Sequence, residues 1–535
     1  MNNELEYLKK RVTEGKLSRR DFMGKASALG VTAAAANLMM ADAVQAQTPK
    51  KGGDFKIGSV GGESTNSLDP ATYASQVPFH NGKQFGDTLV DVAGDGSIKN
   101  LLAESVESSA DAKTWMFKIR KDVEFHNGKT LTPEDVVASL NHHRGEDTNS
   151  AAKGLLESVE DITVDGDTVV VKLSNANADF PFIASDYHLR MMASDGEGNV
   201  DPLDGIGTGA YKLDNFEPGV RAEFTKHANY YKENRGHFDG VQLLSLIDTT
   251  ARQNAVMNGD VDAIDRVDPK TVALLARVPS LKILETTGTL HYTFPMRLDV
   301  TPFENYHLRM ALKLSIKRQE MVDKILLGHG VIGNDHPISI ANRFHNDQMD
   351  QREYDADKAA FHFKESGLEG TTIQLSSSDA AFAGAVDAAQ LIAASAGEAG
   401  INIEVVREPK DGYWSNVWNK KGWCSCYWGG RPTEDWMYQS AYVEGTEWND
   451  TAWRNTEAAD RFNEIVVAAQ AELDVDKRRA MYFETQELIS NDGGAIVPMF
   501  ANHIEALAKN VMHDEKTAGN WEMDGLKMAE RWWFA

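Results

Sequence analysis

The chain has 535 residues, of which 42% are hydrophobic and 25% are charged, so it is a folded globular protein too long for one compact core. We therefore expect two or three lobes. The formal net charge of −25 repels phosphate backbones and anionic lipid surfaces, which argues against binding to nucleic acid or to a membrane surface.

The first 46 residues have the organisation of an export signal. Residues 18–23 read Ser-Arg-Arg-Asp-Phe-Met, which is similar to a twin-arginine motif, and an apolar stretch at 26–40 is too short to span a bilayer. Small residues at 44–46 supply a cleavage site. We predict a twin-arginine signal peptide over 1–46 and an exported, soluble, periplasmic mature protein without a membrane-inserted segment. Its 48 basic and 75 acidic residues give a net charge of −27.

The N-terminal half of the mature chain predicts short strands and one well-marked helix. Apolar residues alternate with others at 115–119, which predicts a strand. Thr132-Pro133-Glu134-Asp135 predicts a helix start, with Thr132 as the N-cap, proline in the first turn and acidic residues beside it. Two valine-rich runs around Asp165-Gly166-Asp167 predict a hairpin.

The C-terminal half alternates more regularly between strand and helix patterns, which favours parallel sheets and an α/β fold. The expected strands are 373–375, 401–405 and 495–500, and the expected helices are 382–399, 454–472 and 476–491. No flexible linker separates these segments. We therefore place chain crossovers between lobes near Thr287–Thr289 and near Asn502, within the sheets themselves.

Motifs of enzymes and metal sites are missing or incomplete. The sequence has no Gly-x-Ser-x-Gly, no P-loop and no His-Glu-x-x-His. The glycine-rich run 205–209 is better explained by a tight turn than by a dinucleotide site. Cys424 and Cys426 are more readily two small buried residues than a redox or metal pair, although a strained disulfide stays open. We predict no catalytic residues, no metal site and no cofactor.

The segment from Cys424 to Asp450 combines aromatic, glycine and charged residues. A strand that ends at Gly429-Gly430 is followed by Thr433, which opens a helix, and ligands collect at such strand ends in α/β folds. Trp428 and Trp448 have the rings to stack on a solute, and Arg431 has the fork to clamp a carboxylate. A plain turn with core tryptophans and a surface arginine explains the same residues equally well.

The mature chain resembles the oligopeptide/dipeptide-binding family of ABC-importer solute receptors along nearly all of its length. Each block is modest alone, and their order makes the resemblance specific. The blocks are Ser67-Leu68-Asp69-Pro70, Leu102-Ala103-Glu104-Ser105, the run 114–128 with Thr132-Pro133-Glu134-Asp135-Val136, Gly205 to Tyr211, Asn258-Gly259-Asp260-Val261-Asp262, Pro302-Phe303 and Arg309-Met310-Ala311-Leu312.

The resemblance implies a two-lobed periplasmic-binding-protein fold with an extra small subdomain and a ligand cleft between the lobes, which close like a hinged clamp. We assign residues 47–288 to lobe I, with an inserted subdomain at about 87–206, and residues 289–502 to lobe II. Residues 503–535 return to lobe I. The implied partners are a small molecule or short peptide and the membrane subunits of an ABC permease, and we expect a monomer.

Two arginines depart from the family pattern. Arg431 stands where peptide binders usually have an aspartate for the peptide ammonium, and Arg297 stands where the family usually has an asparagine. A guanidinium repels an ammonium and attracts a carboxylate, so we expect a solute that carries acidic groups. The predicted ligand-binding residues are Trp428, Gly429, Gly430, Arg431, Arg297, Trp448, Asn449, Asp450 and Ser64.

Three alternatives remain open at this point. The same scaffold binds nickel chelates in relatives of the family, and the fifteen histidines are compatible with that ligand. A secreted α/β hydrolase and a purely structural exported protein are the alternatives from other classes.

Overall fold

The computed structural model describes residues 49–535 except 74, 410–412, 430 and 447, together with residues 21, 22 and 25. The predicted signal peptide and its cleavage site fall almost wholly outside these residues and stay predictions. Within the described part of the chain, no helix combines the length and the apolar composition needed to cross a membrane. We keep the names lobe I for residues 49–288 and lobe II for residues 289–502, and the position of this boundary stays a prediction.

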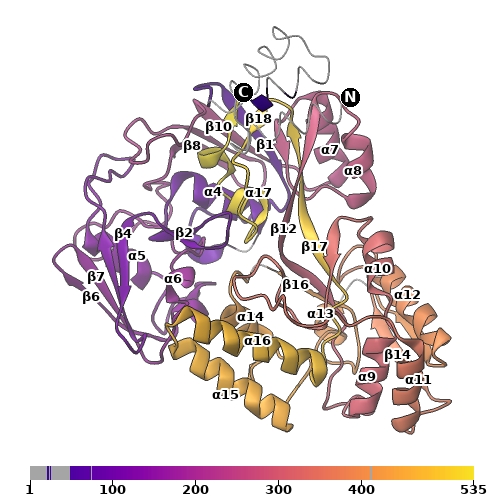
Figure 1. Ribbon diagram of the computed structural model, residues 1–535. Helices are drawn as coiled ribbons and strands as arrows, with labels where there is room; N and C mark the ends of the chain where they lie inside the picture. The colour runs from indigo at the N-terminus through magenta and orange to yellow at the C-terminus, as the bar shows by residue number, and fades with distance from the viewer. Residues whose placement is uncertain are drawn as a thin grey trace.

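A nine-stranded mixed sheet runs through the molecule (Figure 1). Its order is β16-β12-β17-β11-β1-β10-β9-β8, with β13 paired to β17, and only the pairs of β1 with β10 and β11 are parallel. The strands are β1 Asp54–Ser59, β8 Tyr211–Glu217, β9 Arg221–Lys226, β10 Gly240–Ser245, β11 Ala263–Ile264, β12 Leu281–Thr293, β13 Gly330–Ile332, β16 Cys426–Trp428 and β17 Met499–Ala508.

The lobe I part of this sheet is covered by helices whose starts the sequence marks. In α7 (Thr249–Asn258) and α8 (Pro269–Leu275), the side chains of Asp248 and Asp268 accept hydrogen bonds from the backbone NH of Ala251 and Lys270. Helix α4 (Gln76–Phe85) is buried along its whole length. Phe55 and Phe238 stack in this core with ring centroids 4.5 Å apart.

A separate four-stranded antiparallel sheet lies to one side of lobe I, at the left of Figure 1. Its order is β4-β5-β7-β6, and Phe117, Val169 and Val171 fill a core of its own. The elements here are β2 Val90–Val92, β3 Ile98–Asn100, β4 Ala103–Ser108, β5 Thr114–Ile119, β6 Val159–Asp165, β7 Thr168–Leu173, α5 Pro133–Asn141, α6 Phe180–Ile183 and the short 3₁₀ turns Pro70–Thr72 and Lys153–Leu156.

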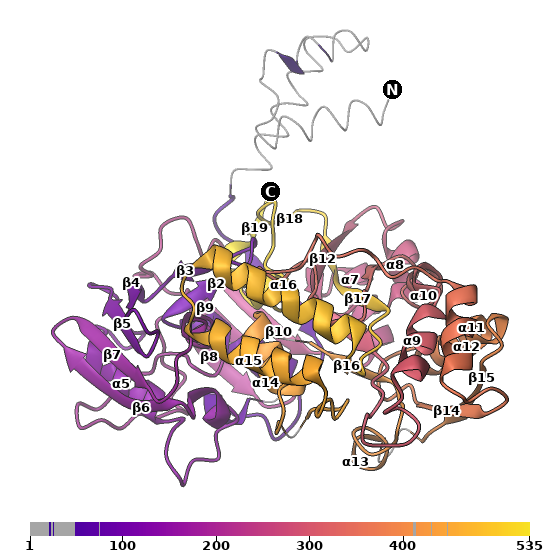
Figure 2. The same ribbon diagram turned by 60° about the horizontal axis from the view of Figure 1, so that its bottom comes forward.

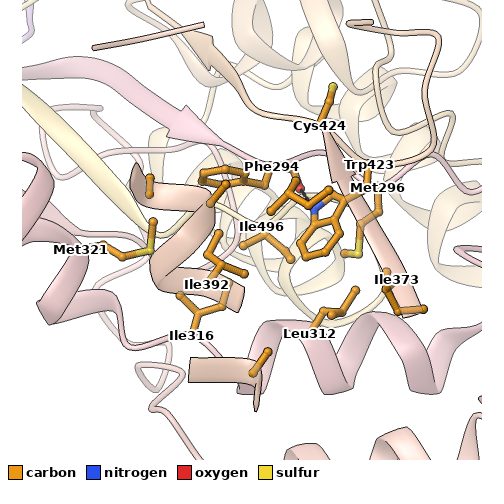
Figure 3. Close-up of a cluster of buried hydrophobic side chains, with 14 of the residues drawn as sticks. Phe294, Met296, Leu312, Ile316, Met321, Ile373, Ile392, Trp423, Cys424 and Ile496 are labelled. Atoms are coloured by element: carbon orange, nitrogen blue, oxygen red, sulfur yellow. Dashed lines mark hydrogen bonds between the residues drawn. The ribbon is translucent and has the colours of Figure 1, made fainter. Parts of the chain in front are cut away.

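Lobe II packs helices around a parallel strand pair and the ends of β12 and β17. Its core is drawn in Figure 3, where Phe294 of the segment after β12 lies near Ile392 of α12 and Ile496. Strands β14 (Thr372–Ser377) and β15 (Asn402–Arg407) form a parallel pair, and helix α12 (Ala385–Glu398) lies between them in the chain. The surrounding helices are α9 Tyr306–Leu314, α10 Arg318–Ile325, α11 Ala356–Glu365 and α13 Tyr413–Asn416.

Three further helices form a second layer of lobe II: α14 (Glu434–Ala441), α15 (Glu457–Ala471) and α16 (Val475–Asn491). In Figure 2 they lie in front of the sheet, between the four-stranded sheet and helices α9 to α12. Their core contains Trp453, Phe462 and Tyr482 and is continuous with Trp428 of β16.

Two long strands, β12 and β17, connect the lobes side by side (Figure 1). Thr287 and Asn502, the two positions where we expected crossovers, pair directly, and the register shifts between Thr287 and His291. Gly288 lies in this irregular stretch, and a Cβ there would come within 2.4 Å of the His503 side chain. The close approach therefore requires glycine.

The C-terminal segment packs onto lobe I through buried ion pairs. Lys527 bonds Asp87, and Arg531 contacts both Asp91 and Asp524, the latter at 2.8 Å. Its elements are β18 Val511–Met512, α17 Glu522–Gly525, α18 Met528–Arg531 and β19 Trp533–Phe534.

One predicted strand is wrong in its position. We expected a strand at 495–500, whereas residues 495–498 have no regular structure and β17 runs from Met499 to Ala508. Pro498 has no NH to donate to a ladder, so the strand begins after it. It then continues through Asn502 because it finds partners in β11, β12 and β13.

Candidate ligand-binding site between the lobes

The segment that joins β16 to α14 is built as the sequence predicts. Strand β16 ends at Trp428, and Thr433 caps α14 by accepting a hydrogen bond from the backbone NH of Trp436 at 3.2 Å. Gly429 lies against Leu290 of β12, with a Cβ position 3.3 Å from a leucine methyl carbon. Gly430 lies outside the described residues, so its predicted role stays a prediction.

Three tryptophans of lobe II gather next to this segment. The ring centroids of Trp418, Trp428 and Trp448 lie 6.0 to 6.4 Å apart. Asp450 is buried beneath them and accepts hydrogen bonds from the indole nitrogens of Trp418 at 3.0 Å and Trp428 at 3.2 Å. Burial raises the pKa of Asp450 to about 6, although both indole hydrogen bonds act to lower it.

These contacts give the predicted residues of this loop different roles. Trp448 is 45% exposed and presents a ring face, whereas Trp428 is buried. Asp450 orients the indoles from below. Asn449 stabilises the local turn, since its side-chain amide donates to the carbonyls of Tyr442 and Val443 at 3.2 and 3.4 Å.

Arg431 is fixed by contacts within lobe II. Its Nη1 donates to the carbonyl of Gly429 at 2.7 Å, its Nε donates to the Ser440 hydroxyl at 3.3 Å, and its guanidinium lies 5.3 Å from the Trp428 ring centroid. Within the described residues, no carboxylate comes within ion-pair distance of it, and Nη2 has no hydrogen-bond partner.

The surroundings of Arg431 include lobe I. Burial lowers the pKa of Arg431, while Tyr187 and Asp186 of lobe I, and Tyr427 of lobe II, act in the opposite direction. The guanidinium is therefore partly desolvated and close to residues of both lobes.

The facing wall of lobe I is also aromatic. Phe79 of α4, Tyr187 and Trp521 of the C-terminal segment form a triad, with ring centroids 4.0 Å apart for Phe79 and Tyr187 and 5.4 Å apart for Tyr187 and Trp521. An aromatic cluster thus lies in lobe I as well as in lobe II, where Arg431 contacts the ring of Trp428.

Two predicted residues lie apart from this arrangement. Arg297 donates to both carboxylate oxygens of Asp299, at 3.0 and 2.8 Å, and to the carbonyl of Asn419 at 2.9 Å. Its guanidinium is therefore occupied within lobe II. Ser64 is exposed in the turn after β1, where its backbone nitrogen lies against Gly219. We leave both out of the site proposed below.

A cavity of about 280 Å³ lies where the lobes and the C-terminal segment meet. Two of its lining residues, Pro432 and Asn520, are the sequence neighbours of Arg431 and Trp521. Two of its lining side chains have buried oxygen atoms without a hydrogen-bond partner in the described residues, namely Oγ1 of Thr289 and Oδ1 of Asn520. The lining residues are Val92 to Gly96, Thr287, Thr289, Ile340, Ala341, Pro432, Thr517, Gly519 and Asn520.

Sequence reasoning missed the lobe I side of the site. Tyr187 and Trp521 are more than 300 residues apart in the chain, so no local spacing connects them. Arg266 of lobe I has a usable sequence signal, because it lies two residues after the end of β11, as Arg431 lies three residues after the end of β16. Four aspartates lie between positions 260 and 268 around Arg266, so this stretch of sequence is acidic overall and does not suggest an anion-binding group.

The remaining polar candidates give simple outcomes. Cys424 and Cys426 are both free and buried, and burial raises the pKa of the Cys424 thiol to about 12. Among the residues that the structure describes, no cluster of three or more histidine, cysteine or acidic side chains has the arrangement of a metal site.

The comparisons with known proteins agree with one another. Residues 97–450 match the family described as "Bacterial extracellular solute-binding proteins, family 5 Middle". The chain is 22% identical over 482 residues to the dipeptide-binding protein of Escherichia coli K12, covering 82% of this chain and 86% of the relative. It spans only 54 and 60% of the length of two other curated relatives it matches.

Two solved structures have the same fold. The PBP AgaA from A. tumefaciens R10, in complex with agropinic acid, is 21% identical with a TM-score of 0.71 over 90% of this chain and 99% of that one. The ABC transporter-associated periplasmic binding protein DppA from Helicobacter pylori, in complex with the peptide STSA, is 19% identical with a TM-score of 0.71 over 92% and 100%. The expected two-lobed α/β fold is confirmed.

Proposed function

Because the chain belongs to family 5 of the bacterial extracellular solute-binding proteins, we propose that it is the substrate-binding component of an ABC importer. It captures a small polar solute that is peptide-like and carries carboxylate groups, encloses it between the lobes, and delivers it to the permease from the periplasm. It acts by binding alone and performs no chemistry on the solute. A signal peptide over residues 1–46 supplies its export.

The observation that carries this proposal is the state of Arg431. Its guanidinium is positioned by Gly429 and Ser440, lies 5.3 Å from the ring centroid of Trp428, and has no carboxylate partner among the described residues. A partly desolvated arginine attracts an anion more strongly than one in water, because less screening separates the charges. A carboxylate at Nη2 meets a planar, always charged donor.

The surroundings fit a polar solute of moderate size. Polar residues, among them Thr289, Thr517 and Asn520, line the adjacent cavity. Trp448 offers an exposed ring for stacking. Three of the similar proteins point the same way, since one is named a dipeptide-binding protein, another holds the peptide STSA, and a third holds agropinic acid.

The first test identifies the solute directly. The mature protein is purified without a histidine tag, denatured, and any released small molecule is analysed by mass spectrometry. A peptide-like carboxylic acid supports the proposal. Stoichiometric nickel would contradict it in favour of a metal-chelate ligand, and a molecule cleaved on renewed incubation with the protein would indicate a hydrolase.

The second test concerns Arg431. We expect Arg431→Gln to weaken binding of the dipeptide Ala-Glu roughly 10-fold or more in calorimetry, because a charge-assisted hydrogen bond contributes about 1.5–3 kcal/mol. Arg297→Gln is the matched control, since that guanidinium is occupied by Asp299 and Asn419. Equal loss in both variants, or in neither, would remove Arg431 from the site.

A further inference from the structure

Arg266 has a strained backbone that its neighbours hold in place. It follows β11 with a φ of 43°, in the left-handed region that is unfavourable for a residue with a side chain. Arg252 maintains this conformation, because its guanidinium donates to the carbonyl of Arg266 at 3.2 Å and to that of Asp265 at 3.1 Å. Arg252 and Asp265 form a buried pair at 3.4 Å.

The guanidinium of Arg266 is anchored on one edge only. Its Nε donates to Oε1 of Glu522 at 2.7 Å, and Glu522 is held in turn by the side-chain amide of Gln76 at 2.8 Å. Within the described residues, Nη1 and Nη2 of Arg266 make no hydrogen bond or ion pair. The side chain is 54% exposed, so these two nitrogens form a donor edge that a solute can reach.

This arrangement differs from that of the buried structural arginines. In Arg309, for example, Nε, Nη1 and Nη2 all donate to backbone or carboxylate oxygens of lobe II. Arg266 instead keeps its Nη1–Nη2 edge unused, although acidic residues outnumber basic ones by 80 to 55 in the whole chain. Packing alone does not require an arginine with this free edge.

Arg266 belongs to the lobe I side of the interlobe site. Its anchor Glu522 directly follows Trp521 of the aromatic triad, and Trp521 lies 5.4 Å from the ring of Tyr187. Asn520, two residues before Glu522, and Pro432, which follows Arg431, line the same cavity between the lobes. The segment that carries Arg431 and the segment that anchors Arg266 therefore meet at this cavity.

We propose that Arg266 is a second anion-binding group, and that the solute carries two carboxylates, one held by Arg431 of lobe II and the other by Arg266 of lobe I. The inference rests on the proposed solute-binding function and specifies its ligand class. Each arginine has a free donor edge and an own-lobe anchor, so a dicarboxylate connects the lobes through two charge-assisted contacts. These contacts form together only when the lobes are closed, and they favour closure to that extent.

The test combines a ligand series with a protein series. The ligands are the dipeptide Ala-Glu, its two monomethyl esters and its dimethyl ester, which carry two, one and no carboxylates. The proteins are the wild-type chain, Arg431→Gln, Arg266→Gln and the control Arg235→Gln. Arg235 pairs with Asp514 on the surface of lobe I at 3.1 Å and lies outside the site. Calorimetry gives the affinities, and circular dichroism confirms that each variant is folded.

We expect Arg266→Gln and Arg431→Gln each to weaken Ala-Glu binding about 10-fold or more, with Arg235→Gln unchanged. One monoester should bind the wild-type chain more weakly than Ala-Glu does. Its affinity should be the same for Arg266→Gln, because the ester already lacks the carboxylate that contacts Arg266. The other monoester behaves in the same way toward Arg431→Gln. This pairing of ester with variant is the signature of two separate carboxylate contacts.

Two contrary results are distinguishable. If the dimethyl ester binds as tightly as Ala-Glu, or if Arg266→Gln changes no affinity, solute binding stands and the second anion subsite is refuted. If neither Ala-Glu nor any ester binds to the wild-type chain, the peptide-like form of the proposed function fails, and the inference that rests on it fails too.

Discussion

At the scale of single residues, Asp450 shows how a buried carboxylate organises the aromatic wall. One oxygen of Asp450 accepts both indole hydrogen bonds, from Trp418 and Trp428. Burial raises its pKa to about 6, above the value near 3.9 in an unfolded chain. The folded chain therefore binds this proton more tightly, and the contribution of Asp450 to stability is full below about pH 4 and declines as the pH rises to about 6.

This shift predicts a stabilising substitution. Asparagine at position 450 keeps an oxygen that accepts both indole hydrogen bonds and removes the cost of a buried charge. We expect Asp450→Asn to raise the apparent melting temperature by roughly 3 °C at pH 8, corresponding to about 3 kcal/mol. The difference from the wild-type chain shrinks toward zero at pH 4, where Asp450 is protonated. Thermal melts from pH 4 to pH 8 measure both.

Asp450→Ala provides the contrast for this prediction. It leaves both indole nitrogens without an acceptor, so we expect lower stability than the wild-type chain at pH 4, by about 1–3 kcal/mol. The deficit should close toward pH 8, where the wild-type chain bears the cost of the buried charge. Destabilisation by Asp450→Asn at pH 8 would mean that the ionised carboxylate itself is required.

At the scale of elements, a latch joins the four-stranded subdomain to lobe II. The backbone NH of Ala178 donates to the carbonyl of Gln470 in α15 at 2.7 Å, and Asp179, the N-cap of α6, forms an ion pair with Arg478 of α16. Both charged side chains are 5% exposed. Breaking a buried pair leaves one charge without compensation, which costs about 3–5 kcal/mol. A substitution that breaks this pair therefore destabilises the conformation in which the subdomain contacts lobe II.

We therefore expect Asp179→Asn to disfavour closure and to weaken Ala-Glu binding at least 10-fold, with a larger radius of gyration in solution scattering. The double variant Asp179→Asn with Arg478→Met should recover part of the loss, because no unpaired charge is left. Glu484→Gln is the control, since the Arg461–Glu484 pair of 2.8 Å is exposed within lobe II and contributes less than about 1 kcal/mol. Unchanged affinity in Asp179→Asn would show that the latch is independent of binding.

Elements with a local cause were predictable from sequence. The start of α5 with Thr132 as N-cap, the hairpin of β6 and β7, the parallel pair β14 and β15 and the Thr433 cap of α14 are all confirmed, because residues close in sequence determine them. The extent of β17 was not predictable. It depends on three partner strands that are distant in sequence.

The site divides in the same way. Trp428, Arg431 and Trp448 lie in one local segment, which is why the sequence proposes them together. The opposite wall comes from separate parts of the chain and carries no shared motif, so Tyr187 and Trp521 emerge only from the fold. Arg297 is the opposite case. The comparison with the family pattern suggested it as a ligand-binding residue, whereas its guanidinium forms an ion pair with Asp299, two residues later in the chain.

At the scale of the whole molecule, the charge of the chain opposes the charge of the proposed solute. The net charge of −25 repels a dicarboxylate at long range, whereas Arg266 and Arg431 attract it only near the site. Salt screens exposed, distant charges most strongly, with a Debye length of about 30 Å at 0.01 M and about 8 Å at 0.15 M. Added salt should therefore reduce the repulsion more than the local attraction.

We accordingly expect the association rate constant of Ala-Glu to rise severalfold between about 0.01 M and 0.15 M salt, as measured by stopped-flow tryptophan fluorescence. The dimethyl ester, which keeps only the positive ammonium, serves as the comparison, and its association rate should fall with salt because the acidic surface attracts it. The dissociation rate should change less, because contacts at the closed interface are poorly screened. An association rate that falls with salt would mean that the field of the two arginines extends beyond the acidic surface, and that the site attracts its anion from a distance.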